Sequence, residues 1–219
     1  MGKLYVVATP IGNLSDITIR AKEIIKKINY IACEDTRITS RLLLSLGIRK
    51  KLISFHQHSK LTKINYIIKL LLSGEDIVLV TDAGTPGISD PGGILIEEAS
   101  KKGIEIFPVP GPSSVTAALS VSGFPADSFV FLGFFPKKKG RETLIKELIR
   151  EKKTIVFFES PHRIKKTLKD LMGIFYERDV VVLRELTKKF EKIYRGKIKD
   201  IINDINPKGE FVVVVRGVK

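Results

Sequence analysis

Residues 77–93, IVLVTDAGTPGISDPGG, decide which fold classes are open to this chain. The run opens with four apolar residues and stops abruptly at Thr81 and Asp82. So short an apolar run, without polar alternation, is typical of a strand that is buried on both faces of a parallel sheet. In open α/β sheets, ligands bind at the carboxyl ends of such strands. We therefore expect an α/β fold with a binding site in the loop that follows residue 80.

The loop itself contains four glycines and two prolines. Glycine lets a backbone approach a ligand closely, and proline fixes the shape of the chain. The loop has neither a Walker-type phosphate motif nor a GxGxxG run, and its only charged residues are Asp82 and Asp90. It therefore disfavours a polyphosphate and favours a cationic or hydroxyl-rich ligand. The alternative is a rigid structural turn between a strand and a helix.

The composition is that of an ordinary globular protein, because 43% of the 219 residues are hydrophobic and 28% are charged. That length allows one large domain or two small ones. No apolar stretch is long enough to span a membrane, and the first residues resemble a strand rather than a signal sequence. A single cysteine, Cys33, excludes a disulfide framework and favours a cytoplasmic location. The three histidines, of which His56 and His58 are expected at the surface, form no zinc-ligand set with it.

The net charge of +14 is unevenly distributed along the chain. Residues 1–120 carry 15 basic and 11 acidic side chains, a net charge of +4, whereas residues 121–219 carry 23 and 13, a net charge of +10. We therefore expect the second half to face a polyanion such as a nucleic acid. The alternative is a lysine-rich surface that only increases solubility.

Strand and helix patterns alternate through the first half of the chain. Short apolar runs such as residues 3–9 precede stretches with helical spacing such as residues 60–72. This order predicts a mostly parallel α/β domain. A second glycine- and proline-rich turn, residues 108–114, follows another predicted strand and leads into a helix that starts near Ser113 or Ser114.

The turn of Gly123, Phe124 and Pro125 marks the expected domain boundary. We place an N-terminal domain with the Gly/Pro-rich loops at residues 1–122 and a basic C-terminal domain at residues 123–219. Strand and helix patterns alternate in the second part as well. The expected fold class is therefore α/β, with two α/β domains.

Seven motifs follow one another along the chain: VATPIGNLSDIT, CEDTR, VTDAGTPGISDPG, PVPGPSSVTAAL, GFFPKKKGR, FFESPHRI and RELTKKFE. In this order they resemble the tetrapyrrole-methylase superfamily. Within it, they are similar to the methyltransferases that modify the ribose 2′-oxygen of a cytidine in small-subunit (16S) ribosomal RNA. The resemblance covers nearly the whole chain.

The resemblance implies two α/β domains with S-adenosylmethionine bound in the cleft between them. It also implies a homodimer and, as partner, small-subunit ribosomal RNA or the assembled small subunit. The acidic loop described above suits the sulfonium of this cofactor. The cofactor-binding residues that the resemblance implies are Ile11, Asp82, Gly84, Thr85, Gly87, Ser113 and Ser114.

A ribose hydroxyl is a weak acid, so its methylation needs a base or a polarising group. Among polar residues near predicted strand ends, we single out Glu159, Asp35 and Lys188. Glu159 follows a buried strand, and its alternative role is to cap the next helix. Asp35 alternatively forms a structural ion pair with Arg37. The remaining candidates are Glu34, His162 and Glu185.

A basic loop, Lys137–Lys139 followed by Arg141, lies at the end of a predicted strand. We expect these residues to contact RNA phosphates, and the alternative is a solvated lysine run. Two roles also remain open for Arg163: it contacts a phosphate through both guanidinium nitrogens, or it is a solvated residue of a helix.

Aromatic residues cluster on the strand that precedes this loop. Alternation places Phe129 and Phe131 on one face, where we expect them in the core. We expect Phe134 and Phe135, at the end of the strand, to line the cofactor cleft or a dimer contact.

Three functions remain open at this point. The first is the ribose 2′-O-methyltransferase of ribosomal RNA, and the second is a methylase of a tetrapyrrole such as a precorrin. A polycarboxylate tetrapyrrole would also account for a basic surface, so charge does not separate these two. The third is a non-enzymatic RNA-binding or ribosome-assembly protein.

Overall fold

A computed structural model describes residues 1–55 and 61–218, so His56 and His58 lie outside the described residues. The chain has a mixed α/β fold and divides into two compact units, Met1–Ser113 and Ser114–Lys219. The sequence placed the boundary after residue 122, at the far end of helix α5 (Ser114–Ser122). That helix packs on strands of the second unit, so the division between the compact units falls before α5 rather than after it.

The first unit contains a five-stranded sheet with the order β3-β2-β4-β1-β5. Every neighbouring pair of its strands is parallel, as the alternation of strand and helix patterns predicts. Its central strands are short and apolar, and all three residues of β4 are buried. The strands are β1 (Leu4–Val7), β2 (Tyr30–Cys33), β3 (Lys51–Ser54), β4 (Ile77–Leu79) and β5 (Ile106–Val109).

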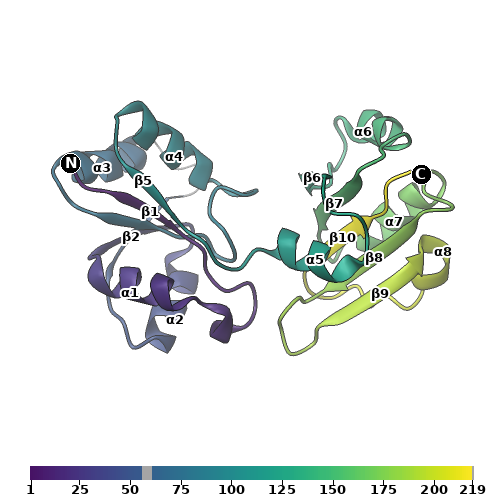
Figure 1. The fold of residues 1–219 in the computed structure, drawn as a ribbon, viewed down its shortest axis with the longest axis horizontal. Coiled ribbons are helices and arrows are strands. Elements are labelled where there is room, and N and C mark those ends of the chain that lie inside the picture. The colour runs from purple at the N-terminus through teal and green to yellow at the C-terminus, as the bar shows by residue number, and fades with distance from the viewer. Residues whose placement is uncertain (56–60, 219) are drawn as a thin grey trace. The chain divides into compact units, whose positions relative to one another are not determined.

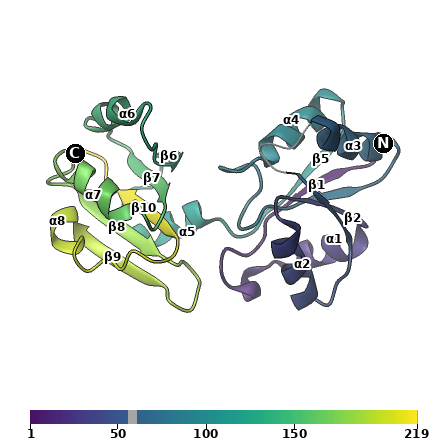
Figure 2. The same ribbon diagram turned by 180° about the vertical axis from the view of Figure 1, so that it is seen from behind.

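Two helices cover each face of this sheet, as Figures 1 and 2 show from opposite sides. Ile25 of α1 and Leu43 of α2 pack with Val78 on one face. Ile67 of α3 and Leu95 of α4 pack with the next residue, Leu79, on the other face. The helices are α1 (Ile19–Lys27), α2 (Thr36–Ser45), α3 (Leu61–Leu72) and α4 (Gly92–Lys101), and a short 3-10 turn, η1 (Leu14–Asp16), precedes α1.

This arrangement creates a switch point at the carboxyl ends of β1 and β4. The two strands are neighbours, but the chain leaves β1 for a helix on one face and leaves β4 for a helix on the opposite face. Their loops therefore diverge, and such a divergence forms the crevice where open α/β sheets bind ligands. The loop at residues 81–91 lies at this point, as the sequence predicts.

The second unit has a mixed sheet with the order β6-β7-β10-β8-β9. Only β6 and β7 run parallel, and the other neighbouring pairs are antiparallel. In the described part of the chain, no helix has the length and apolarity needed to cross a membrane. The elements are β6 (Phe129–Phe134), α6 (Arg141–Leu148), β7 (Thr154–Glu159), α7 (Ile164–Met172), β8 (Asp179–Arg184), β9 (Lys192–Lys197), α8 (Ile198–Ile201) and β10 (Phe211–Val215).

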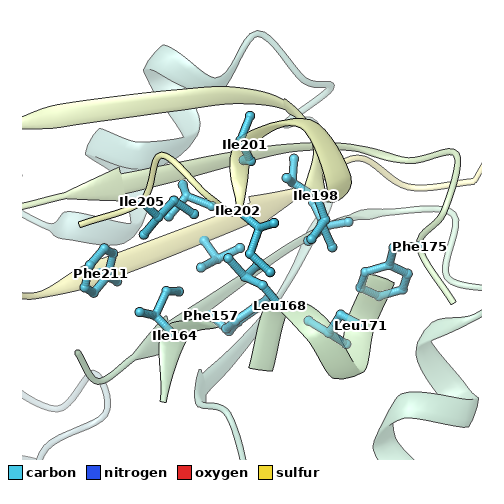
Figure 3. Close-up of a cluster of buried hydrophobic side chains, with 14 of the residues drawn as sticks. Phe157, Ile164, Leu168, Leu171, Phe175, Ile198, Ile201, Ile202, Ile205 and Phe211 are labelled. Carbon is cyan, nitrogen blue, oxygen red and sulfur yellow. The ribbon is translucent and has the colours of Figure 1, made fainter. Parts of the chain in front are cut away.

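The main core of this unit lies between one face of the sheet and helices α7 and α8. Figure 3 shows Leu168 of α7 and Ile202, at the end of α8, close to Phe157 of β7. On the other face, Val115 and Leu119 of α5 pack against a smaller set of strand residues. The second unit is therefore built around helices on both faces of its own sheet.

A bulge in β6 overturns the prediction for Phe135. The pairing with β7 shifts between Phe131 and Phe134, where Gly133 has a φ of 62°. The bulge moves Phe134 to the face of Phe131, and it directs Phe135 to the opposite face, into the main core. Phe135, expected at a cleft or dimer contact, is thus 1% exposed. Phe129, expected in the core, lies before the bulge at the start of the edge strand β6 and is 40% exposed.

Candidate functional site

The loops that follow β1 and β4 are joined by backbone hydrogen bonds. Thr9 N donates to Gly84 O at 2.9 Å, and Gly84 N donates to Thr9 O at 3.1 Å. The buried Thr9 hydroxyl also donates to Thr81 O at 3.2 Å. These contacts fix the glycine-rich loop at the switch point of the sheet.

Three of the predicted cofactor-binding residues meet around Gly84. This residue has a φ of 83°, in the left-handed region that favours glycine. A Cβ added there would lie 3.3 Å from Cγ2 of Ile11 and 3.7 Å from Pro112 O. The Thr85 hydroxyl donates to the same Pro112 carbonyl at 3.1 Å. The structure thus brings Ile11, Gly84 and Thr85 together beside the turn that ends in Ser113, and Ser114 begins α5 in the second unit.

Asp90 closes the loop upon itself. Its Oδ1 atom accepts hydrogen bonds from Gly87 N at 2.9 Å and from Gly92 N at 2.6 Å. A Cβ on Gly92 would lie 2.8 Å from that same oxygen, so the turn requires glycine there. Gly87, with a φ of 85°, supplies a second left-handed position. The loop is therefore a preformed structure. This agrees with a binding loop and equally with the alternative given above, a rigid structural turn between a strand and a helix.

Acidic side chains gather at the carboxyl ends of β2 and β4. Asp82 Oδ1 accepts a hydrogen bond from Asp35 N at 3.0 Å, so the loop after β4 touches the loop after β2. Burial, followed by repulsion from Asp82, Asp90 and Asp35, raises the pKa of Glu34. Burial also raises the pKa of Asp82, against the hydrogen bond from the Asp35 backbone. This edge of the sheet therefore carries more negative charge than its surroundings neutralise.

Asp35 behaves differently from its two acidic neighbours. Its side chain caps α2 by accepting a hydrogen bond from Arg37 N at 2.8 Å, and it pairs with the Arg37 guanidinium at 2.6 Å. These bonds, the side-chain bond first, lower the pKa of Asp35 to about 2. The ion pair that the sequence left open is present, and Asp35 is a weak base.

The arrangement suits a cationic ligand with an apolar body. A positive charge near Glu34 and Asp82 would relieve their mutual repulsion. Ile11 packs on the bare backbone at Gly84, so the neighbouring part of the loop is apolar. Among the described residues, no three acidic, histidine or cysteine side chains are placed to hold a metal ion.

Glu159 lies in the second unit and is enclosed by partners. Its Oε1 accepts from Ser160 N at 2.6 Å and pairs with Arg163 at 2.6 Å, while its Oε2 accepts from the Thr167 hydroxyl at 2.7 Å. The side chain has no exposed area. These contacts anchor the turn before α7 and two side chains near its start, but α7 has no side-chain cap hydrogen bond, so the capping alternative is wrong in the strict sense. Arg163 also donates to Phe135 O at 2.9 Å, so it is a structural residue rather than a free phosphate ligand.

Lys188 follows β8 in a loop with unusual backbone angles. Glu185 and Thr187 have φ values of 53° and 64°, which are rare for residues other than glycine. Lys188 Nζ lies 3.1 Å from Glu185 Oε1 and 2.9 Å from Glu210 Oε2. Burial opposes protonation of Lys188, but the bonds to Glu210 and Glu185 raise its pKa on balance. Lys188 is therefore a stable cation and a hydrogen-bond donor.

The basic loop after β6 contains one anchored residue and three exposed ones. Arg141 donates to Pro136 O at 2.8 Å and pairs with Asp170 at 2.8 Å, and its side chain is 13% exposed. The expectation that Arg141 contacts phosphate is wrong in this respect, because the guanidinium is used inside the unit. Lys137, Lys138 and Lys139 are exposed, as is the candidate His162.

Sequence reasoning missed Thr9 and undervalued Glu34. Thr9 follows a strand as an ordinary residue, and no local signal predicts its bridge to Gly84. Glu34 stood in the list of candidates, but its raised pKa depends first on burial in the folded chain and then on Asp82 and Asp90, which are distant in the sequence. The order of strands in the sheet, which brings the ends of β2 and β4 together, is the information that was lacking.

Comparison with known proteins gives one family and a set of similar full-length proteins. The sequence model of the Tetrapyrrole (Corrin/Porphyrin) Methylases matches residues 3–202. A protein of Thermotoga maritima named ribosomal RNA small subunit methyltransferase I is 46% identical over 99% of this chain and 99% of its own length. A protein of the same name from Mycoplasmopsis pulmonis is 45% identical over 98% and 97%.

Solved structures share the fold at much lower identity. The uroporphyrin-III-C-methyltransferase of Thermus thermophilus matches with a TM-score of 0.69 and 20% identity, over 98% of this chain and 94% of that one. The methyltransferase CobJ matches with a TM-score of 0.72 and 19% identity, over 100% and 95%. These two likenesses concern the fold alone.

Proposed function

Because the chain belongs to the tetrapyrrole (corrin/porphyrin) methylase family, we propose that it transfers a methyl group from S-adenosylmethionine to the 2′-oxygen of a cytidine ribose in small-subunit (16S) ribosomal RNA. The observation that carries this proposal is the 46% identity, over whole chains, to a protein named ribosomal RNA small subunit methyltransferase I. The identity to the uroporphyrin enzyme is 20%. We therefore assign the substrate by similarity to the ribosomal RNA methyltransferases rather than to the uroporphyrin methyltransferase.

The cofactor site that we propose is the edge of the first sheet around Gly84. Ile11, Gly84 and Thr85 would contact the apolar and ribose parts of the cofactor, with Gly87 shaping the loop and Asp82 facing its positive charge. Ser113 and Ser114, on the adjoining turn and helix start, complete the set. When bound, S-adenosylmethionine supplies an electrophilic methyl group on a sulfonium. The chain contributes alignment, because an in-line displacement depends mainly on the positions of the reacting atoms.

Of the carboxylates considered, Glu34 is the one whose surroundings suit a general base. Asp35, with a pKa of about 2, binds protons too weakly, and Glu159 is surrounded by hydrogen-bond partners. The pKa of Glu34 is raised by burial and by neighbouring charges, so its carboxylate is a stronger base than an ordinary glutamate. We propose that Glu34 accepts the ribose proton, that Asp35 positions its loop, and that Lys188, in the second unit, binds an RNA phosphate as a cation.

The proposed substrate also has consequences for location and assembly. An enzyme that modifies small-subunit ribosomal RNA would work in the cytoplasm, and the single cysteine of the sequence supports this location. A homodimer would bury Phe134, an aromatic side chain that is 58% exposed. Light scattering on the purified chain gives the mass that tests this assignment.

A competition between substrate classes tests the proposed function. Labelled S-adenosylmethionine is incubated with small subunits that lack the modification, with protein-free RNA and with a tetrapyrrole precursor. We expect label in RNA from at least one of the first two samples and none in the tetrapyrrole. Label in the tetrapyrrole alone would overturn the proposal. A titration in which the chain binds no S-adenosylmethionine would instead support the non-enzymatic RNA-binding alternative.

A further inference from the structure

A groove runs along the edge strand of the first unit, away from the site described above. One part, of about 620 Å³, is lined by Tyr30, Arg49, Lys50 and Lys51 together with Asn29 and Glu75. The other part, of about 460 Å³, is lined by β3 and by Thr62, Lys63 and Tyr66 of α3. Tyr30 and Lys51 line both parts, so the two hollows adjoin each other along β3. We call this surface the β3 groove.

The β3 groove extends from one end of the sheet to the other. Lys51, in its first part, pairs with Tyr30 at the amino ends of the strands. Ser54, in its second part, pairs with Cys33 at the carboxyl ends, and Glu34 follows Cys33 directly. A chain lying in the groove would therefore lead toward the acidic edge of the proposed methyl-transfer site.

The groove carries positive charge that is not neutralised locally. Arg49, Lys50 and Lys51 are consecutive, and Lys63 lies across from them on α3. Glu75 is the only acidic residue among those described as lining it. Within residues 1–55 and 61–218, none of the four cations forms an ion pair, although Lys63 Nζ donates to Ser54 Oγ at 2.9 Å and Lys50 Nζ to Lys26 O at 2.6 Å. Unpaired cations at a surface attract a polyanion.

Aromatic rings and an open strand edge distinguish the groove from a merely basic surface. Tyr66 is 52% exposed, and Lys51 Nζ lies 5.3 Å from the ring centre of Tyr30. Among the residues that the structure describes, strand β3 pairs with β2 on one side and with no strand on the other, so its outer edge offers backbone donors and acceptors. Cations for phosphates, rings for bases and polar groups for riboses are the combination used by grooves that bind single-stranded nucleic acid. An acidic protein segment would use the cations but not the ring face of Tyr66.

We propose that the β3 groove binds a single-stranded segment of the substrate RNA, next to the nucleotide that is methylated. The identity of the polyanion as RNA rests on the proposed function, whereas the groove itself rests on its charge, rings and open edge. It would act as a second RNA contact besides the exposed lysines of the second unit.

Matched lysine pairs provide the first test. Lys50→Ala with Lys51→Ala removes two charges from the groove, and Lys101→Ala with Lys102→Ala removes two from the end of α4. RNA binding is measured by fluorescence anisotropy on a single-stranded oligonucleotide over a series of salt concentrations. The groove variant should lower the slope of log K against log salt by about 1.4 and weaken binding more than about tenfold at 0.1 M salt. The α4 variant should change neither, and equal behaviour of the two variants would overturn the proposal.

Tyr66 provides the second test. Tyr66→Leu should weaken RNA binding at least about fivefold, because base stacking is lost, whereas Tyr66→Phe should bind as the unchanged chain does. A polyglutamate peptide should compete weakly, and competition as strong as that of RNA would contradict the assignment. Methyl transfer to RNA together with an inert groove would overturn this inference alone. Groove-dependent RNA binding without methyl transfer would overturn the proposed function alone.

Discussion

At the edge of the first sheet, the pKa values of Glu34 and Asp82 are raised, so ionisation of either carboxyl group costs more than it does in water. Burial withdraws both from water, and no cation among the described residues forms an ion pair with either. A positively charged ligand would stabilise the ionised forms of these two carboxyl groups, and its binding would therefore be favoured. This surplus of negative charge is the property that connects individual residues of the site to a sulfonium cofactor.

The first prediction concerns Glu34 as the base. A carboxyl with a raised pKa loses its charge at a higher pH than an ordinary glutamate, whose pKa is about 4.3. Methyl transfer should therefore fall as the pH is lowered through the raised pKa, while the fold remains. Glu34→Gln should reduce the rate about a hundredfold or more and remove this pH dependence.

Unfolding provides the control for Glu34→Gln. A folded-state pKa above the unfolded value means that ionisation destabilises the fold, and this destabilisation grows as the pH rises through the folded pKa. The urea midpoint of Glu34→Gln at pH 7 should thus equal or exceed that of the unchanged chain. A variant that loses both activity and stability would show Glu34 to be structural.

The second prediction concerns Gly84. Replacement by alanine should cost about 1–2 kcal/mol because of its left-handed backbone, and the same cost applies to Gly103, with a φ of 70°. Only at Gly84 does the added methyl group meet Ile11, since nothing lies within 4 Å at Gly103. Calorimetry should show S-adenosylmethionine bound at least about tenfold more weakly by Gly84→Ala and unchanged in Gly103→Ala. Equal affinities would remove the loop from the site.

Among the secondary-structure elements, helix α7 owes its starting position to one buried carboxylate. Glu159 joins the end of β7 to Ser160, Arg163 and Thr167, and Thr167 in turn accepts from Arg141 at 3.2 Å. The network therefore connects the loop after β6 with the first turns of α7. With this many partners, the main role of the Glu159 carboxylate is to stabilise the fold.

The third prediction separates the structural and catalytic roles of Glu159. Glu159→Gln leaves Arg163 without its partner and should lower the free energy of unfolding by about 3 kcal/mol. The exposed Glu147, changed to glutamine, should alter it by less than about 0.5 kcal/mol. Methyl transfer, measured well below the unfolding temperature, should be retained in both variants. Loss of the reaction in a stable Glu159→Gln chain would restore Glu159 as the base.

Most elements were predictable because their signals are local. The buried strand at Ile77 and the alternation of strands and helices in the first half both follow from short stretches of sequence. The bulge at Gly133 was not predictable, because it depends on how β6 pairs with β7. One inserted residue reversed the faces of the aromatic side chains that follow it, which explains the error at Phe135.

For the whole molecule, long-range charge is the property that relates the chain to RNA. The excess of positive charge lies mainly in residues 121–219, while the acidic edge around Asp82 lies in the first unit. The proposed RNA substrate and the proposed cationic cofactor would thus be bound by surfaces of opposite sign. The sequence predicted both tendencies, but it did not predict that Arg141 and Arg163 are engaged within the second unit by Asp170 and Glu159.

The fourth prediction concerns the three exposed lysines after β6. Changing Lys137, Lys138 and Lys139 to alanine should lower the salt slope of RNA binding by about 2, with S-adenosylmethionine affinity unchanged. The Arg141 anchor remains in this variant, so the loop keeps its shape. An unchanged slope would identify these lysines as a solvated run. Loss of cofactor and RNA binding together would make the loop structural.

The chemical nature of the methylated product tests the central claim most directly. A ribose whose 2′-oxygen carries a methyl group cannot attack the neighbouring phosphate, so that linkage resists alkali. Small-subunit RNA labelled by this chain from S-adenosylmethionine should therefore release the label, after complete alkaline hydrolysis, in a dinucleotide whose 5′ residue is cytidine. Label recovered only in mononucleotides would mean methylation of a base and would contradict the account.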